Sequence, residues 1–136
     1  MLLLVGGLLG GCWLGQAGME LPHQLPGESY PGDRGELTGV LDVADNGCRH
    51  IVLDAGTYFV IWPSGSDAAD LGELPAGVRL PGGDVIADGD TLVGTGALTP
   101  TAPLTADRNG WWAHVIGYCA PDASEVFVFD SARGGE

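Results

Sequence analysis

Lysine is absent from this chain, and its only fixed positive charges are five arginines, set against 18 aspartates and glutamates. The formal net charge is −13 with neutral histidines. Proteins that bind nucleic acid through its phosphates rely on clustered lysine and arginine side chains, and this sequence holds no such cluster. The same shortage disfavours charge-driven binding to anionic lipid. We interpret the acidic residues as a solvated surface, with attraction of a cationic partner or of divalent ions as the alternative.

Long hydrophobic runs are also lacking. The apolar stretch at the N-terminus, Leu2 to Leu14, has 13 residues, whereas a membrane-spanning helix needs about 20. Its length is typical of the apolar region of a signal peptide. Within it, the sequence Leu9-Gly10-Gly11-Cys12 resembles the bacterial lipobox. This resemblance implies that residues 1–11 are removed as a lipoprotein signal peptide and that acylated Cys12 anchors the protein on the extracytoplasmic side of the membrane.

The N-terminal stretch differs from a usual signal because no lysine or arginine precedes the apolar run. An upstream start codon would supply the missing charge. Two alternatives therefore stay open. A plain secretory signal would be cleaved without lipidation, and a buried strand or helix would make Cys12 a passive thiol of the core.

The segment from Trp13 to Gly35 contains Pro22, Pro26 and Pro31 and no alternating apolar run. We predict that residues 12–35 form a lipid-anchored flexible tether with a root-mean-square reach of about 25 Å. The folded domain is expected at residues 36–131, followed by a short tail at 132–136. A domain of this length can build one small hydrophobic core.

Amphipathic helices of ten or more residues are not predicted in this domain. Short β-branched and aromatic runs alternate with glycine, aspartate, asparagine and proline, which is typical of strands and turns. Asp45-Asn46-Gly47 indicates a tight hairpin, and the stretch 64–76 is expected to be a loop or a loop with a helical turn at Ala68 to Leu71. The state of Trp111 to Cys119 is left open. The expected strands are residues 36–43, 48–53, 57–62, 77–80, 84–87, 91–98 and 125–130.

These elements predict an all-β fold. A three-stranded meander, a connecting segment and later strands match the OB-fold, a small Greek-key barrel, so we expect a five- to six-stranded OB-like barrel, with a β-sandwich as the alternative. Gly39, Gly94 and Gly96 lie inside predicted strands and suit the curvature of a closing barrel. The pattern from Trp62-Pro63-x-Gly65 through Gly89-Asp90 is similar to that of small uncharacterised exported bacterial domains, a resemblance that implies no known activity.

Cysteine is scarce: if Cys12 is acylated, only Cys48 and Cys119 are left. Outside the cytoplasm such a pair is most simply a disulfide. We therefore predict a Cys48–Cys119 bond that ties the two ends of the barrel together. The alternative is a tetrahedral zinc site formed by Cys48, His50, His114 and Cys119, although this spacing matches no common zinc motif.

Catalytic signatures are missing as well. No nucleophile elbow or spaced triad occurs, and Asp84, Asp88 and Asp90 are interpreted as turn residues because the later acidic ligand of a calcium loop is absent. Trp111 and Trp112 are either core residues or a binding surface. We expect a non-catalytic envelope module without a cofactor that binds an unidentified protein or small ligand, and not nucleic acid. A metal-binding or redox protein is the alternative.

Overall fold

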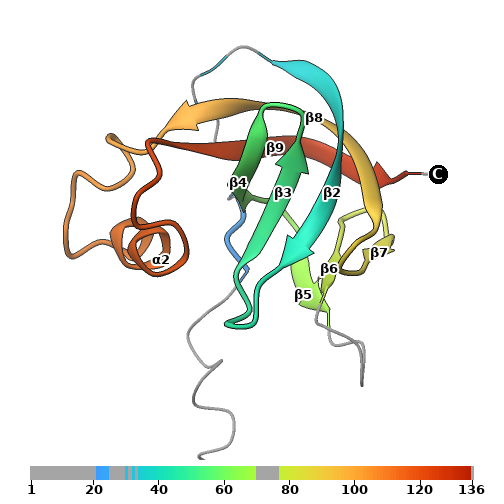
Figure 1. The fold of residues 1–136 in the computed structure, drawn as a ribbon, viewed down its shortest axis with the longest axis horizontal. Helices are drawn as coiled ribbons and strands as arrows, with labels where there is room; N and C mark the ends of the chain where they lie inside the picture. The colour runs from blue at the N-terminus through green and yellow to red at the C-terminus, as the bar shows by residue number, and fades with distance from the viewer. Residues whose placement is uncertain (1–20, 25–29, 31, 33, 70–76, 136) are drawn as a thin grey trace, which may run out of the picture.

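The fold was determined as a computed structural model, which describes residues 21–24, 30, 32, 34–69 and 77–135. It is predominantly β, as the sequence predicts (Figure 1). Its elements are β2 (Gly35–Val43), β3 (Arg49–Leu53), β4 (Gly56–Ile61), β5 (Asp67–Ala69), β6 (Gly77–Arg79), β7 (Val85–Ile86), β8 (Thr91–Pro100), α2 (Trp111–Cys119) and β9 (Glu125–Gly134).

Five strands close into a barrel in the order β2-β3-β4-β9-β8, with β8 returning to pair with β2. The β4–β9 pair is parallel, with Val60 opposite Phe127, and the other neighbours in the barrel are antiparallel. This Greek-key arrangement confirms the OB-like barrel and not the sandwich. The first barrel strand, β2, closes the barrel by pairing with β8 and not with the last strand, β9.

The barrel interior is filled by alternate residues of its strands, since successive side chains point to opposite faces. Trp62, just after β4, stacks on Phe129 of β9 with ring centroids 5.6 Å apart. A small antiparallel sheet, β5-β6-β7, contributes Val78, Leu80 and Ile86 to the same cluster. It therefore seals one end of the barrel. The other buried members of this interior cluster are Leu21, Leu41, Ile51, Val60, Leu92 and Phe127.

Glycines inside the strands allow the barrel to close tightly. A Cβ atom at Gly96 would overlap the carbonyl oxygen of Val128, and one at Gly94 would overlap that of Ser131. The register of β8 against β9 shifts between Thr95 and Gly96. Gly94 and Gly96 thus lie where β8 comes too close to the β9 backbone for a side chain to fit. This close approach agrees with their predicted role in the curvature of the barrel.

The open question at Trp111 to Cys119 is resolved as the helix α2. Its Trp112, Val115, Ile116 and Cys119 follow the spacing of one helix face and pack on Phe59, Ile61, Val126 and Val128, which point outward from β4 and β9. These residues form a second cluster outside the barrel, which we call the outer cluster. The helix α2 lies away from the small sheet (Figure 1). Within the described part of the chain, no helix is long and apolar enough to cross a membrane.

The predicted tether is wrong at Leu21 to Gln24, which pack on the barrel. Leu21 is 2% exposed and belongs to the interior cluster. The backbone N–H of Trp62 donates to the carbonyl of Pro22, and that of Gln24 donates to the carbonyl of Trp62, both at 2.8 Å. The Gln24 side chain donates to the Phe129 carbonyl at 2.7 Å. Because the segment is rich in proline, its sequence did not indicate this strand-like pairing with Trp62, just after β4.

Two further expectations at the edges of elements were wrong. Residues 67–69 form the strand β5 and not a helical turn, because they pair with β6. The strand β9 runs four residues past Asp130 to Gly134, so residues 132–134 belong to the barrel and not to a tail. The predicted signal peptide and Cys12 lie outside the described residues.

Candidate functional site

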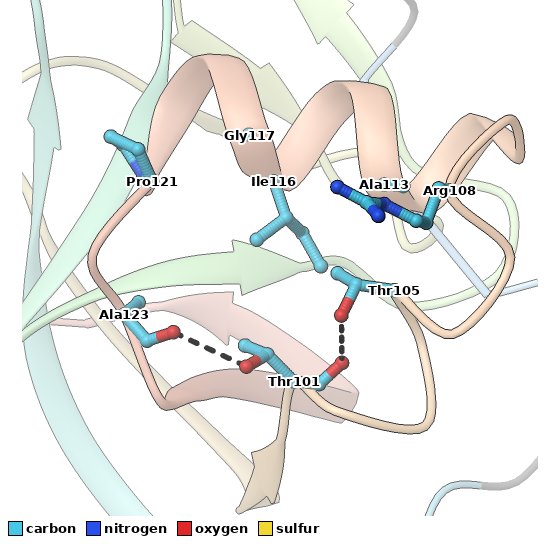
Figure 2. A pocket seen from close by; sticks show the side chains of 8 residues that line it. All are labelled: Thr101, Thr105, Arg108, Ala113, Ile116, Gly117, Pro121 and Ala123. Atoms are coloured by element: carbon cyan, nitrogen blue, oxygen red, sulfur yellow. Dashed lines mark hydrogen bonds between the residues drawn. The ribbon is translucent and has the colours of Figure 1, made fainter.

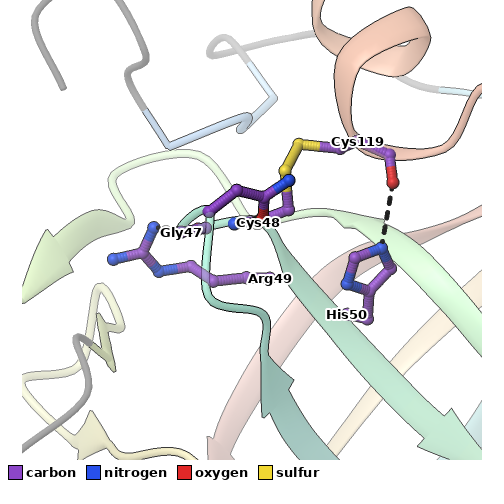
Figure 3. Close-up of a disulfide and its surroundings, with 6 residues drawn as sticks. Gly47, Cys48, Arg49, His50 and Cys119 are labelled. Carbon is purple, nitrogen blue, oxygen red and sulfur yellow. Dashed lines mark hydrogen bonds between the residues drawn. A yellow bond between two sulfur atoms is a disulfide. The ribbon is translucent and has the colours of Figure 1, made fainter. Parts of the chain in front are cut away.

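The predicted bond between Cys48 and Cys119 is present, with their sulfur atoms 2.05 Å apart and their Cα atoms 5.6 Å apart (Figure 3). Cys48 follows the β2–β3 turn, where its backbone N–H donates to the Asn46 side chain at 3.0 Å. Cys119 is the last residue of α2. The disulfide therefore fixes the end of α2 to this turn, and it does not join the two ends of the barrel as expected.

His50 has a structural partner beside the disulfide. Its Nε2 lies 3.2 Å from the carbonyl oxygen of Cys119, and its ring meets Phe59 edge-on at 6.0 Å. The zinc alternative requires free thiolates at Cys48 and Cys119, but in this structure these sulfurs are bonded to each other. Within the part of the chain that the structure describes, no group of three or more histidine, cysteine or acidic residues is arranged to hold a metal.

Arg49, next to His50 on β3, points to the other side of the strand (Figure 3). Its guanidinium donates to the carbonyls of Gly77 at 3.0 Å and Gly47 at 2.9 Å. Burial lowers the pKa of Arg49 below its ordinary value. Because its donors bind backbone carbonyls of β6 and of the hairpin turn, Arg49 connects the barrel to the small sheet and is not presented to a ligand.

The three aspartates considered for calcium each accept a hydrogen bond from a backbone N–H. Asp84 accepts from Gly134 at 2.8 Å, Asp88 from Val43 at 2.8 Å, and Asp90 from Ala87 at 2.9 Å. The Asp84 and Asp88 bonds hold the turns before and after β7 against β9 and β2, and the Asp90 bond closes the turn after β7. Their interpretation as turn residues is therefore supported by specific contacts.

Of the two tryptophans considered as core or binding-surface residues, Trp112 is in the core and Trp111 is on the surface. Trp112 packs into the outer cluster and meets Tyr30 edge-on at 6.4 Å. Trp111 is 42% exposed and contacts the edge of Trp112 at 4.7 Å. On the helix, Trp111, His114 and Tyr118 are spaced i, i+3 and i+7, which places them along one side of α2, and all three are exposed, Tyr118 to 55%. We call these three residues the aromatic face.

A pocket of about 430 Å³ lies between α2 and the loop that follows β8 (Figure 2). The helix residues that line it, Ala113, Ile116 and Gly117, are not those of the aromatic face. Its apolar side includes Ile116 and Pro121, and Thr101 and Thr105 line the opposite wall. Figure 2 shows the guanidinium of Arg108 pointing from the loop toward Ile116. The sequence analysis assigned neither an element nor a candidate site to residues 99–110, and it therefore missed this pocket. An arginine beside two tryptophans in a chain this acidic was the available signal.

A second hollow, of about 400 Å³, lies at one mouth of the barrel. Leu37, Leu53, Leu98 and Phe127 line it, and they also belong to or pack against the interior cluster. The only ionisable residue in its lining is Glu36. We interpret this hollow as the open end of the core and not as a ligand site. Its lining is mainly apolar and lacks the convergent polar groups that orient a ligand.

Known proteins do not assign a function to this arrangement: the chain matches no protein-family model, no curated protein and no solved structure. The function is therefore inferred from the geometry of the region around α2.

Proposed function

We propose that this protein is an exported, non-catalytic binding module that is anchored to the membrane through acylated Cys12 and uses α2 as its recognition element. The observation that carries the proposal is that the disulfide and the outer cluster hold α2 rigidly on the barrel while its aromatic face stays exposed. Rigid aromatic side chains lose little conformational entropy on binding, which makes them effective contact residues.

The extracytoplasmic location is supported by the disulfide, because such bonds persist outside the reducing cytoplasm. The lipobox-like sequence at Leu9 to Cys12 supports the anchor. Acyl chains are needed to explain membrane attachment, since a surface with a net charge of −13 is not attracted to anionic lipid.

The non-catalytic assignment rests on what the candidate side chains do. His50 is engaged with Cys119, and Asp84, Asp88 and Asp90 are engaged with backbone N–H groups. Within α2 itself, the exposed residues other than glycine are Trp111, His114 and Tyr118, and exposed aromatic side chains are common in binding surfaces.

Site-specific photo-crosslinking in intact cells tests this function. A photoreactive residue at Tyr118, on the aromatic face, is expected to give a discrete crosslinked product. The same residue at Val85 on β7, which is also exposed at 41%, serves as the matched control and should not give that product. Trp111→Ala should remove the Tyr118 product. Identical products from both positions, or a Tyr118 product insensitive to Trp111→Ala, would show that α2 is not the recognition element.

A further inference from the structure

We propose that the pocket beside α2 binds a carboxylate at the end of a short apolar chain, with Arg108 as the anchoring residue. This inference rests on the proposed function as a binding module and names the chemical class of one ligand. It concerns the space between α2 and the loop after β8, a region distinct from the aromatic face (Figure 2).

The charge of Arg108 is available to a ligand. This side chain makes no hydrogen bond or ion pair with any residue that the structure describes. The neighbouring Asp107 forms no ion pair with it, and Asp107 Oδ1 instead accepts a hydrogen bond from the backbone N–H of Asn109 at 3.1 Å. By comparison, Arg34 is paired with Asp130 at 2.7 Å. Arg108 is the only arginine in the lining of this pocket, so its position and not merely its lack of a partner makes it the candidate anchor.

The guanidinium group favours a carboxylate because its planar N–H donors match the two oxygens of that group. Ala113, Ile116, Pro121 and Ala123 contribute apolar groups to a lining that also contains Thr101 and Thr105, so one part of the pocket can contact a short apolar chain. A ligand with an anionic end and a small apolar chain would thus place each part against matching protein atoms. A pocket of about 430 Å³ is large enough for a chain of a few small residues or an equivalent acyl chain.

The threonine wall of the pocket is held in place by its own hydrogen bonds. The Thr101 hydroxyl donates to the Ala123 carbonyl at 3.2 Å, and the Thr105 hydroxyl donates to the Thr101 carbonyl at 3.1 Å. Their protons are therefore used, so among the side chains that line the pocket only Arg108 can donate to a bound anion. The hydroxyl oxygens still have lone pairs that can accept an N–H from a ligand. A peptide carboxy terminus offers both the carboxylate and such N–H groups, whereas a simple organic acid offers only the carboxylate.

The pocket can be altered without disturbing the fold. Gly117 lines it, and a Cβ atom at this position would meet no heavy atom within 4 Å. A leucine at Gly117 would take up part of the pocket's volume while leaving α2 and the outer cluster unchanged. Arg133 lies on β9, is exposed like Arg108 and does not line the pocket. It provides a control for the loss of one positive charge.

The test is an NMR titration of the full-length chain in non-ionic detergent with acetyl-trialanine, its C-terminal amide, and hexanoate. The free acid should give saturable shifts at the signals of Ala113 and Gly117, and the amide should bind much more weakly. Arg108→Gln should raise the Kd about tenfold, the effect expected on losing a charge-assisted hydrogen bond. Gly117→Leu should also weaken binding, and Arg133→Gln should leave the Kd unchanged.

The two carboxylate probes distinguish the sources of the ligand. A lower Kd for the peptide acid than for hexanoate would identify a peptide carboxy terminus, and the reverse or equality would identify an organic acid; both outcomes support the site. Unsaturable shifts, equal binding of acid and amide, or an unchanged Kd in Arg108→Gln would overturn it. The crosslinking at Tyr118 does not depend on Arg108, so a failed titration with a successful crosslink rejects this pocket and leaves the binding module standing.

Discussion

His50 and Cys119 meet through a 3.2 Å contact between Nε2 of the imidazole and the carbonyl oxygen at the end of α2. The sulfur of the same Cys119 is bonded to Cys48, two positions before His50. The start of β3 and the residue just before it thus hold the helix end by a hydrogen bond and a covalent bond. This double attachment makes α2 part of the barrel, although the helix has no side-chain N-cap and rests on a single apolar face.

Removing the disulfide should destabilise the protein strongly. The bond closes a loop of 71 positions, for which the chain-entropy model gives at most about 4 kcal/mol. Cys48→Ser, Cys119→Ser and the double variant should lower the melting temperature by similar amounts, because each opens the same loop. In a Cys12→Ser background, thiol titration of the denatured, unreduced chain should find no free thiol. Two free thiols with bound zinc would support the alternative function, and two free thiols without metal would contradict the disulfide.

Replacing Cys12 with serine should release the protein from membranes without unfolding it. Cys12 lies nine positions before Leu21, the first residue that the structure describes in the core, and we expect the substitution to leave the barrel folded. Several acyl chains anchor a protein firmly, since each buried CH₂ contributes about 0.8 kcal/mol. Fractionation of cells without detergent measures the effect. If the serine variant stays in the membrane fraction, the lipid anchor is wrong.

Leu21→Ala should destabilise the barrel by about 2 to 5 kcal/mol, the usual cost of emptying a buried leucine site. The reason is that Leu21 is 2% exposed within the interior cluster. Val85→Ala is a suitable control because Val85 is 41% exposed, and its effect should stay below about 0.5 kcal/mol. Urea unfolding monitored by circular dichroism gives both values. Equal effects of the two substitutions would mean that Leu21 belongs to a tether after all.

The strands and the barrel were predictable because alternation and turn residues are local signals. Asp45-Asn46-Gly47 and the run Glu125 to Asp130 directly mark the hairpin and the last strand. The disulfide was predicted from the three cysteines together with two hypotheses, that Cys12 is acylated and that the domain lies outside the cytoplasm. The contact of Leu21 with the core could not be predicted from the sequence. It depends on backbone hydrogen bonds of Pro22 and Gln24 with Trp62, about 40 positions later in the chain.

The helix α2 and its pocket were unpredictable for a related reason. Val115 and Ile116 are β-branched, which favours strands, and a run of nine residues can be read either way. The deciding factor is the apolar outer side of β4 and β9, which offers Val115 and Ile116 a surface to pack on. Arg108 acquires a possible role only once that packing brings its loop beside the helix.

Alanine at Gly96 and alanine at Gly117 should have opposite effects on stability. At Gly96 a Cβ atom would overlap the Val128 carbonyl and crowd the Phe127 ring, so β8 and β9 would have to separate. We expect a loss of at least about 1 to 3 kcal/mol, as for an overpacked core. At Gly117 a Cβ atom would enter open space on a helix, and alanine is favoured there by up to about 1 kcal/mol because glycine costs helix stability. Thermal unfolding of the two variants beside the unmodified protein provides the measurement. A destabilised Gly117→Ala would indicate that α2 is not helical at this position, and a neutral Gly96→Ala would contradict the close approach of β8 and β9 that closes the barrel.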